Sequence, residues 1–331
     1  MNKAKQLRET GVNMIKKKKI ILLICAFILI ALLGVSYQQY GLYQQRSLYP
    51  PVGKMMSVNG HAMHIIANGS ASSTGTLVMT AGSGTTTPYA DFYPIMPGLQ
   101  QHGRVVLYER PGYGWSEAAD TPRDVDTITE ELHHLLAASG ELPPYILLGH
   151  SMGALEIIRF AQLYPEEVAG LIFLDGISPQ YARDFSTNWV ADIGWNAIAT
   201  AKHIGLLRAL SDMNLINGMF VDIDDLPEEL KKLKIIMALR NANNPDMKEE
   251  RQRLNENGLA VLRGGSLGDL AILVLSAPNN GYPNWANTQN ELIQLSNNSQ
   301  QIKFEQAGHY IHHDAPDKVI SSIASFITSL Q

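Results

Sequence analysis

One serine in the sequence has neighbours that are typical of a nucleophile. Residues 145–165 read YILLGHSMGALEIIRFAQLYP, which is a short apolar run, then GHSMG, then a helical pattern. Ser151 thus lies in a G-x-S-x-G motif, in the strand–turn–helix context that exposes a serine hydroxyl at a sheet edge. Gly149 and Gly153 leave space for the sharp turn, since side chains there would crowd it. The alternative is an ordinary serine at a helix N-terminus.

A serine hydroxyl needs a base to become a nucleophile, and the chain has ten histidines. His309 follows the last predicted strand on a loop, from which its ring can reach a nucleophile. His312 and His313 lie farther from the strand end, and we interpret them as solvent-facing residues or residues at a helix start. His150 is next to the serine, but its side chain is expected to point away. We therefore predict that His309 is the base.

The base needs an acid that fixes its tautomer and stabilises the imidazolium. The loop APNNGYPNWANTQNE, 277–291, follows a predicted strand, but it has no aspartate, and its Glu291 lies deep in the next helix. Asp175 ends the preceding apolar run, GLIFLD. The order Ser151, Asp175, His309 agrees with the serine–acid–histidine order that accompanies the motif. We predict Asp175 as the acid; the alternative is a plain turn residue before a glycine.

Two backbone N–H groups are predicted to hold an oxyanion. One belongs to Met152, at the start of the helix after the serine. The other is assigned to Ser83, in the loop after the first parallel strand, where Gly82 and Gly84 let the backbone approach a ligand closely. The alternative is a plain tight turn. A phosphate-binding loop is disfavoured, because neither the Lys-Ser/Thr ending nor full G-x-G-x-x-G spacing occurs.

The elements that must position these residues are short apolar runs alternating with helical patterns. Predicted strands are 76–80, 104–109, 145–149, 170–175, 271–276 and 301–306, and predicted helices include 124–139, 151–164, 285–296 and 315–329. Strands without polar alternation, separated by helices, indicate a mostly parallel sheet covered on both faces. Residues 54–69 predict a hairpin with Asn59-Gly60 as its turn, which would add antiparallel strands at one edge.

Residues 178–268 interrupt this alternation, because they contain no convincing strand. They hold two amphipathic stretches, roughly 186–210 and 226–242. We predict a helical cap over the carboxyl edge of the sheet, where ligand sites of open α/β sheets lie. The core would then comprise 54–177 and 269–331, and the alternative is a helical domain unrelated to the site.

The N-terminus has the pattern of a membrane anchor. Residues 1–19 carry seven Lys and Arg against one Glu, and the run IILLICAFILIALLGV that follows is uncharged. We expect a basic cytoplasmic segment at 1–19, a transmembrane anchor or signal segment at 20–37 and a linker at 38–53, with the catalytic domain outside the cytoplasm. Cleavage of a signal peptide and secretion is the alternative, and a start at Met14 would favour it. A buried core helix is disfavoured because the run is apolar on every face.

Charge and cysteine content exclude other classes. Beyond residue 19 the chain has 19 basic and 30 acidic residues, a net charge of −11, which disfavours binding to nucleic acid. Cys25, the only cysteine, lies in the apolar run, so the remaining chain has no disulfide and no thiol chemistry. No His/Cys group has the spacing of structural zinc, and we expect no metal. The sequence does not indicate an oligomeric state.

Three motifs together resemble the α/β-hydrolase fold superfamily, in its cap-bearing branch of small esterases, lipases and related peptidases. They are GHSMG, ERPGYGWS at 109–116 and AGHYIHHDAP at 307–316, and the resemblance covers roughly 54–330. It implies an α/β-hydrolase fold, with a mostly parallel central sheet flanked by helices. A helical cap would follow the sixth strand, and the N-terminal transmembrane helix would precede this fold.

The second motif is similar to the family's D-R-P-G-Y-G-x-S turn, with Glu109 in place of the aspartate. Arg110 and the two glycines of the turn would be structural there. The family's usual His-Gly in the oxyanion loop is Ala81-Gly82 here. The family places its acid after either of two neighbouring strands, and Asp175 matches the earlier placement.

The resemblance implies a serine hydrolase that needs no cofactor. Ser151 would attack the carbonyl of a small, partly apolar ester or amide while His309 takes its proton, and His309 would then activate water. The serine argues against haloalkane dehalogenase chemistry, which uses an aspartate nucleophile in this fold.

Three other functions stay open. An aminopeptidase-type hydrolase would need a carboxylate pair in the cap for the substrate ammonium, which could come from Asp222, Asp224, Asp225, Glu228 or Glu229. A transferase or C–C bond hydrolase could use the same triad. A ligand-binding homologue without turnover would gain little from an intact triad.

Overall fold

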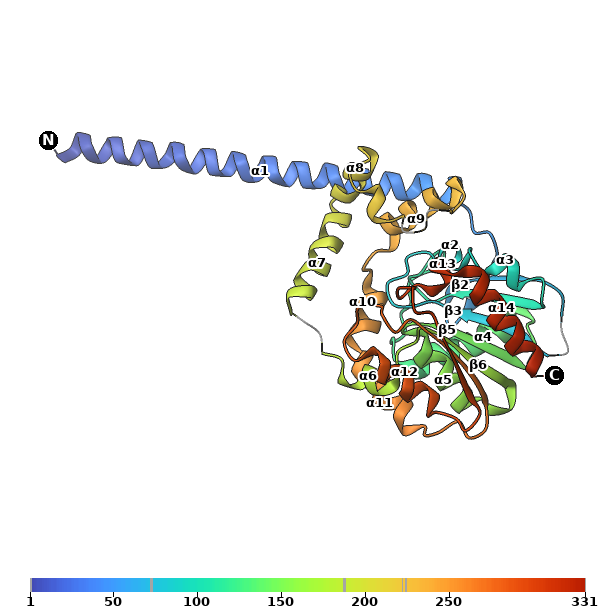
Figure 1. Ribbon diagram of the computed structural model, residues 1–331. Helices are drawn as coiled ribbons and strands as arrows, with labels where there is room; N and C mark the ends of the chain where they lie inside the picture. Colours follow the sequence, from blue (N-terminus) through green and yellow to red (C-terminus); the bar gives the residue numbers. More distant parts are fainter. Residues whose placement is uncertain (1, 72–73, 187–188, 222, 224, 331) are drawn as a thin grey trace.

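The computed structural model describes residues 2–71, 74–186, 189–221, 223 and 225–330 (Figure 1). Its centre is an eight-stranded sheet in the order β1-β2-β4-β3-β5-β6-β7-β8. The strands are β1 (Lys54–Val58), β2 (His61–Asn68), β3 (Thr76–Thr80), β4 (Arg104–Glu109), β5 (Tyr145–His150), β6 (Val168–Leu174), β7 (Ala271–Ser276) and β8 (Ser299–Lys303). Pairs β1–β2 and β2–β4 are antiparallel, and the other pairs are parallel. The mostly parallel sheet with an antiparallel hairpin at one edge is therefore confirmed.

The two ends of this sheet show how local sequence sets the strands. Asn59 and Gly60 have φ values of 49° and 92°, as the predicted two-residue hairpin turn requires. At the other edge, β8 ends at Lys303 rather than at residue 306, so the loop that carries His309 is longer than predicted. Strand β6 ends at Leu174, which leaves Asp175 as the first residue beyond it.

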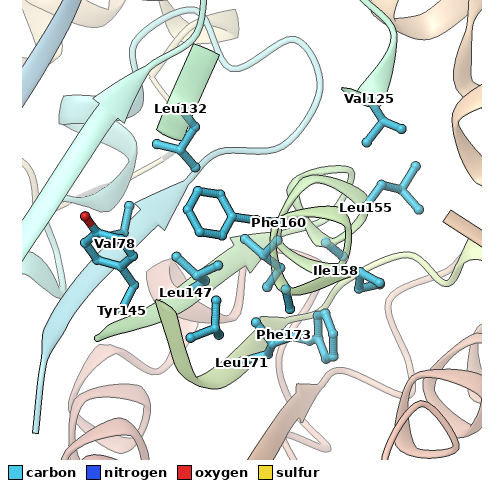
Figure 2. Packing of buried hydrophobic residues seen from close by; sticks show 14 of the residues in the cluster. Val78, Val125, Leu132, Tyr145, Leu147, Leu155, Ile158, Phe160, Leu171 and Phe173 are labelled. Atoms are coloured by element: carbon cyan, nitrogen blue, oxygen red, sulfur yellow. The ribbon is translucent and has the colours of Figure 1, made fainter. Parts of the chain in front are cut away.

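Helices cover both faces of the sheet. They are α2 (Pro88–Phe92), α3 (Met96–Leu99), α4 (Val125–Ser139), α5 (Gly153–Leu163), η1 (Pro165–Glu167), α12 (Trp285–Ile293), α13 (Ile311–Asp314) and α14 (Pro316–Ser329). Figure 2 shows one face, where side chains of α4 and α5 pack onto β3, β5 and β6: Leu132, Leu155, Ile158 and Phe160 onto Val78, Leu147, Leu171 and Phe173. Alternate strand residues, such as Leu148 and Ile172, face α3 and α14. Both faces are buried, which explains the strands' continuous apolar runs.

The insertion after β6 is helical. It comprises α6 (Pro179–Asp184), α7 (Trp189–His203), α8 (Leu206–Asp212), η2 (Asn217–Met219), α9 (Glu228–Asn241), α10 (Pro245–Gln252) and α11 (Leu254–Arg263), and its described residues form no strand. Leu254 and Val261 of α11 belong to the core cluster under α4 and α5. In Figure 1, α6 and α11 lie on the sheet domain, whereas α7, α8 and α9 project toward the N-terminal helix. The predicted cap after the sixth strand is therefore present, with its two ends packed on the core.

Helix α1 runs without a break from Asn2 to Leu48. Its part from Lys16 to Leu48 is long and apolar enough to cross a membrane, by length and composition alone. The structure differs from the predicted linker, because the helix continues through most of 38–53. Gln38 explains the continuation: its amide donates to Leu239 O at 2.9 Å, and its oxygen accepts from Arg208 Nε at 2.8 Å, so this part of the helix packs on the cap.

Candidate active site

Ser151 lies in the sharp turn between β5 and α5. Its φ of 52° is left-handed, a strained conformation for a residue with a side chain. A Cβ on Gly149 would lie 2.6 Å from Gly153 O, and a Cβ on Gly153 would lie 2.9 Å from Thr80 Cγ2. Both glycines are thus required by close packing, as the sequence predicted.

The structure brings the three predicted residues together. His309 Nε2 lies 2.9 Å from Ser151 Oγ, and His309 Nδ1 lies 2.7 Å from Asp175 Oδ2. The carboxylate accepts from Nδ1–H, which fixes the tautomer in which Nε2 accepts the serine proton. The residues come from three separate turns, after β5, β6 and β8, which meet at the carboxyl edge of the sheet. This is the arrangement that activates a serine hydroxyl.

Asp175 is fully buried and is held by four donors. Besides His309, its Oδ1 accepts from Ala277 N and Trp285 Nε1, and its Oδ2 accepts from the Asn280 amide, each at 2.8 Å. An unpaired buried carboxylate would be costly, and these donors stabilise it. All three come from the loop and helix start after β7, which supply no acid themselves. Sequence analysis missed these donors because amides and an indole give no motif.

Asp175 also occupies a restricted backbone position. Its φ is 47°, and its N–H donates to Leu275 O at 2.7 Å. The competing acid, Glu291, has a different partner, because its carboxylate accepts from Ser178 Oγ. The turn after β6 therefore both ends the strand and directs the Asp175 carboxylate at His309.

The two other histidines of the AGHYIHHDAP segment lie at a helix start, the second of the two predicted alternatives, and they do not face solvent. His312 is fully buried in α13, and its Nε2–H donates to Asp91 Oδ2 at 3.2 Å. His313 donates from Nε2 to the Asp91 backbone oxygen at 3.1 Å. They lie at a helix start, as expected, but α2 and its Asp91 cover them.

These three residues are also a group whose ligand atoms all lie within 4.8 Å of one another, as in many metal sites. Burial alone raises the pKa of Asp91, but the hydrogen bonds from His312 and His313 outweigh it and hold that pKa well below its usual range. Burial lowers the pKa of His312 to about 4. A neutral, hydrogen-bonded imidazole beside a carboxylate accounts for this geometry without a metal ion.

His150 forms no hydrogen bond with Ser151 among the described residues and instead supports the loop of His309. Its ring is buried, and Nε2 lies 3.2 Å from the backbone oxygen of His309, to which it donates. Burial lowers the pKa of His150 well below its usual range, and His312 and His309 add to the effect. A neutral ring here fixes the backbone of the predicted base.

The predicted oxyanion loop approaches the serine closely. A Cβ on Gly82 would lie 3.0 Å from Ser151 Cβ, so a side chain there would require these neighbours to shift. Among the residues that the structure describes, neither Ser83 N–H nor Met152 N–H donates to a protein acceptor. Both N–H groups are thus free to bind a ligand, and their role stays a prediction.

Arg110 binds the backbone of this loop through hydrogen bonds. Its guanidinium donates to Ala81 O at 2.8 Å and to Gly82 O at 3.2 Å, and its Nε donates to Glu250 Oε1 at 3.1 Å. Glu250 lies on cap helix α10 and also accepts from Tyr113 OH at 2.6 Å. Burial opposes the charge of Arg110, but Glu250 outweighs it, so the pKa of Arg110 is raised.

Arg110 is structural, as predicted, and Glu250 is the partner that sequence analysis missed. The two residues lie 140 positions apart, so no local pattern joins them. The nearby Glu156 also accepts from Arg110, at 3.4 Å, but burial raises the pKa of Glu156 well above the usual range and the Glu250 charge adds to that rise, so Glu250 is the stronger charge partner. The cap is thereby tied to the loop beside the serine.

Comparison with known proteins agrees with this architecture. A family model described as alpha/beta hydrolase fold matches residues 82–316. The chain is similar to uncharacterized protein YbdG of Bacillus subtilis (strain 168), with 26% identity over 312 residues, 92% of this chain and 95% of the relative.

Two solved structures have a similar fold. The enol-lactonase from Burkholderia xenovorans LB400 has a TM-score of 0.58 and 20% identity, over 83% of this chain and 100% of that one. The meta-cleavage product hydrolase from Pseudomonas fluorescens IP01 has a TM-score of 0.60 and 16% identity, over 85% and 99%. At such identities the likeness shows the fold alone, and it is the predicted fold.

Proposed function

From the premise that the chain belongs to the α/β-hydrolase fold family, we propose that it is a serine hydrolase that cleaves an ester or amide bond through an acyl-enzyme. One observation carries the proposal: His309 lies within hydrogen-bond distance of both Ser151 Oγ and Asp175 Oδ2. A serine, a base and an orienting acid in this order of contact are the requirements for nucleophilic acyl transfer.

In the acylation step, Ser151 Oγ attacks the substrate carbonyl as its proton passes to His309 Nε2. Asp175 stabilises the resulting imidazolium through Nδ1–H, while Met152 N–H and Ser83 N–H bind the oxyanion. The C–O or C–N bond then breaks, and the proton on Nε2 goes to the leaving group. The acyl group remains on Ser151.

In the deacylation step, His309 takes a proton from water, and the hydroxide oxygen attacks the acyl carbon. The oxyanion returns to the same two N–H groups, and the ester bond to Ser151 breaks. His309 returns the proton to Oγ, so an acid is released and the enzyme is restored. The chain's own residues supply each proton transfer, so no cofactor is needed.

An ester is favoured over a peptide as the substrate. The described cap carboxylates Asp225, Glu228 and Glu229 are exposed, and Glu228 pairs with Lys231 at 3.2 Å. Such solvated groups would hold a substrate ammonium weakly. Asp222 and Asp224 lie outside the described residues. The structural neighbours' names, enol-lactonase and meta-cleavage product hydrolase, fit hydrolysis without selecting a substrate.

We further propose that α1 anchors the enzyme in a membrane, with the catalytic domain outside the cytoplasm. The seven basic residues before the apolar run support this orientation. Protease added to intact cells should digest the catalytic domain, and full protection would contradict the orientation.

Labelling with a fluorophosphonate probe tests the nucleophile. The full chain should be labelled, Ser151→Ala should not, and Ser321→Ala, which changes an exposed serine of α14, should label like the wild type. Undiminished labelling of Ser151→Ala would contradict the assignment. Turnover of p-nitrophenyl esters supports an esterase, turnover of aminoacyl anilides alone would favour an aminopeptidase, and no turnover despite labelling would favour a binding protein.

A further inference from the structure

Helix α7 of the cap is almost uncovered, although its sequence is rich in apolar residues. Trp189 is 73% exposed, and Ile193 lies one turn further along the same exposed side. The helix is attached by its polar edge: Lys248 Nζ donates to Asn196 Oδ1 at 3.2 Å, and Arg251 lies over the Trp195 ring. The side chains of Trp189 and Ile193 stay exposed to solvent.

Further exposed apolar residues follow along the chain in α8, in η2 and in the turn between them. We call this region the apolar cap surface, and its main members are Trp189, Ile193, Leu206, Met213, Leu215 and Met219. Met219 is 80% exposed. Large apolar surfaces of this kind are rare on soluble monomers and mark sites of contact with a protein or a membrane.

The apolar cap surface adjoins the end of the apolar run of α1. A Cβ on Gly34 would lie 2.1 Å from Ile204 O, and a Cβ on Gly205 would lie 2.3 Å from Gly34 O, so the α7–α8 junction touches α1 there. The buried bond between Arg208 and Gln38 joins the same elements one turn later. Helix α1 and the cap therefore form one unit, and the cap's position follows that of the helix.

The direction of α7 fits a membrane surface. In Figure 1, α7 runs across α1 rather than along it and lies on the side of the sheet domain toward the N-terminus. If α1 crosses a bilayer, α7 is therefore oriented along the bilayer surface, at the level where the uncharged run 20–35 ends. An amphipathic helix with tryptophan on its apolar side is typical of the boundary between head groups and acyl chains.

We propose that the apolar cap surface lies in the interface of the membrane that α1 crosses, with bilayer lipid as its partner. The inference rests on the proposed anchor and is independent of the serine chemistry. The continuity of the surface with the apolar run of α1 favours lipid over a second copy of the chain.

Tryptophan quenching in vesicles tests this contact. The full chain is reconstituted in phosphatidylcholine–phosphatidylglycerol vesicles that carry a spin label near the head group. The emission of the Trp195→Phe/Trp189→Phe double variant is subtracted from that of Trp195→Phe. The difference is the emission that depends on Trp189. We expect the shallow label to lower that emission about twofold. Trp115 and Trp285 are buried and provide a constant background.

A pair of matched positions provides the control. In the double-Phe background, Met219→Trp should be quenched, whereas Leu142→Trp should not. Leu142 is 74% exposed, similar to Met219, but it precedes β5 at the amino edge of the sheet, away from the cap. Equal quenching at both positions would show nonspecific adsorption and overturn the proposal.

Cys25, the only cysteine, reports on the anchor in the same samples when it carries an environment-sensitive dye. A buried dye with unquenched Trp189 overturns the cap contact while the anchor stands. A solvent-exposed dye overturns both. A third outcome is that aqueous quenchers do not reach Trp189, that lipid labels do not quench it, and that cross-linking yields dimers. This result would assign the surface to a second copy of the chain and would also overturn the proposal. Fluorophosphonate labelling of Ser151 tests the serine chemistry separately.

Discussion

Two buried aspartates in this molecule each bind a histidine of the AGHYIHHDAP segment, with different outcomes. Asp175 accepts from His309, whose other nitrogen contacts Ser151. Asp91 accepts from His312, whose Nδ1 is buried without a partner. His309 remains partly exposed, whereas His312 is sealed by Phe92, which stacks on its ring. The residue types are the same, so the proposed catalytic pair differs from the other pair in what the second ring nitrogen of the histidine reaches.

The largest expected difference between the two groups is in turnover. Asp175→Asn should lower kcat about 10⁴-fold, because the base loses its tautomer control and its counter-charge. Asp91→Asn, the matched change, should lower thermal stability but leave kcat of the folded protein within about tenfold of wild type. Ester hydrolysis and thermal unfolding measure both. Wild-type turnover in Asp175→Asn would contradict the proposed catalytic role of Asp175 and its difference from Asp91.

The second expected effect concerns the predicted oxyanion donors, which lie beside the Asp175–His309 pair and have no counterpart at the Asp91–His312 pair. Ser83→Pro removes the backbone N–H and should lower kcat about 10²–10³-fold. Ser83→Ala keeps that N–H, so its kcat should stay near wild type. Steady-state kinetics of the two variants separate backbone from side chain. Equal activity in both would contradict the assignment of Ser83.

A smaller effect is expected from the donors that hold Asp175. Trp285→Phe removes the indole N–H from Oδ1 and should lower kcat about tenfold, since the carboxylate loses one of its hydrogen bonds. Trp115→Phe removes a similar indole hydrogen bond, which goes to Tyr49 O and not to a residue of the proposed triad. Its kcat should not change. Equal losses in the two variants would indicate general destabilisation rather than positioning of Asp175.

The smallest expected effect concerns the Asp91–His312 pair and is measured as the pH dependence of stability rather than as turnover. The pKa of His312 is about 4 in the folded protein against an ordinary value of 6.5, so the unfolded chain binds more protons between these values. Stability should therefore fall as the pH drops from about 6.5 to 4, by roughly 3 kcal/mol at most. His312→Gln should flatten this part of the profile in thermal unfolding. An unchanged profile would assign the dependence to other groups.

Much of the site could be predicted from the sequence, because its signals are local. The turn that presents Ser151, the loop position of His309 and the placement of Asp175 after an apolar strand each lie within a few residues of a recognisable pattern. The same holds for the strands, whose apolar runs follow from burial on both faces. These features agree with one another, and the fold follows from their order.

What could not be predicted depends on contacts between distant segments. His312 is buried because α2, more than two hundred residues earlier, covers it. Glu250 meets Arg110 only after the cap folds over the sheet. The continuation of α1 into the predicted linker has the same cause, since Gln38 is held by Arg208 from the cap. No local pattern encodes such partners.

The unbroken passage of α1 into the cap has a mechanical consequence. A spanning helix tilts when the bilayer becomes thinner than its apolar length. Since Gly34 and Gln38 fix the cap to α1, such a tilt would act as a lever on α10 and, through Glu250 and Arg110, on the loop beside Ser151. Under the proposed membrane anchor, bilayer thickness would thus influence the geometry of the loop beside the proposed nucleophile.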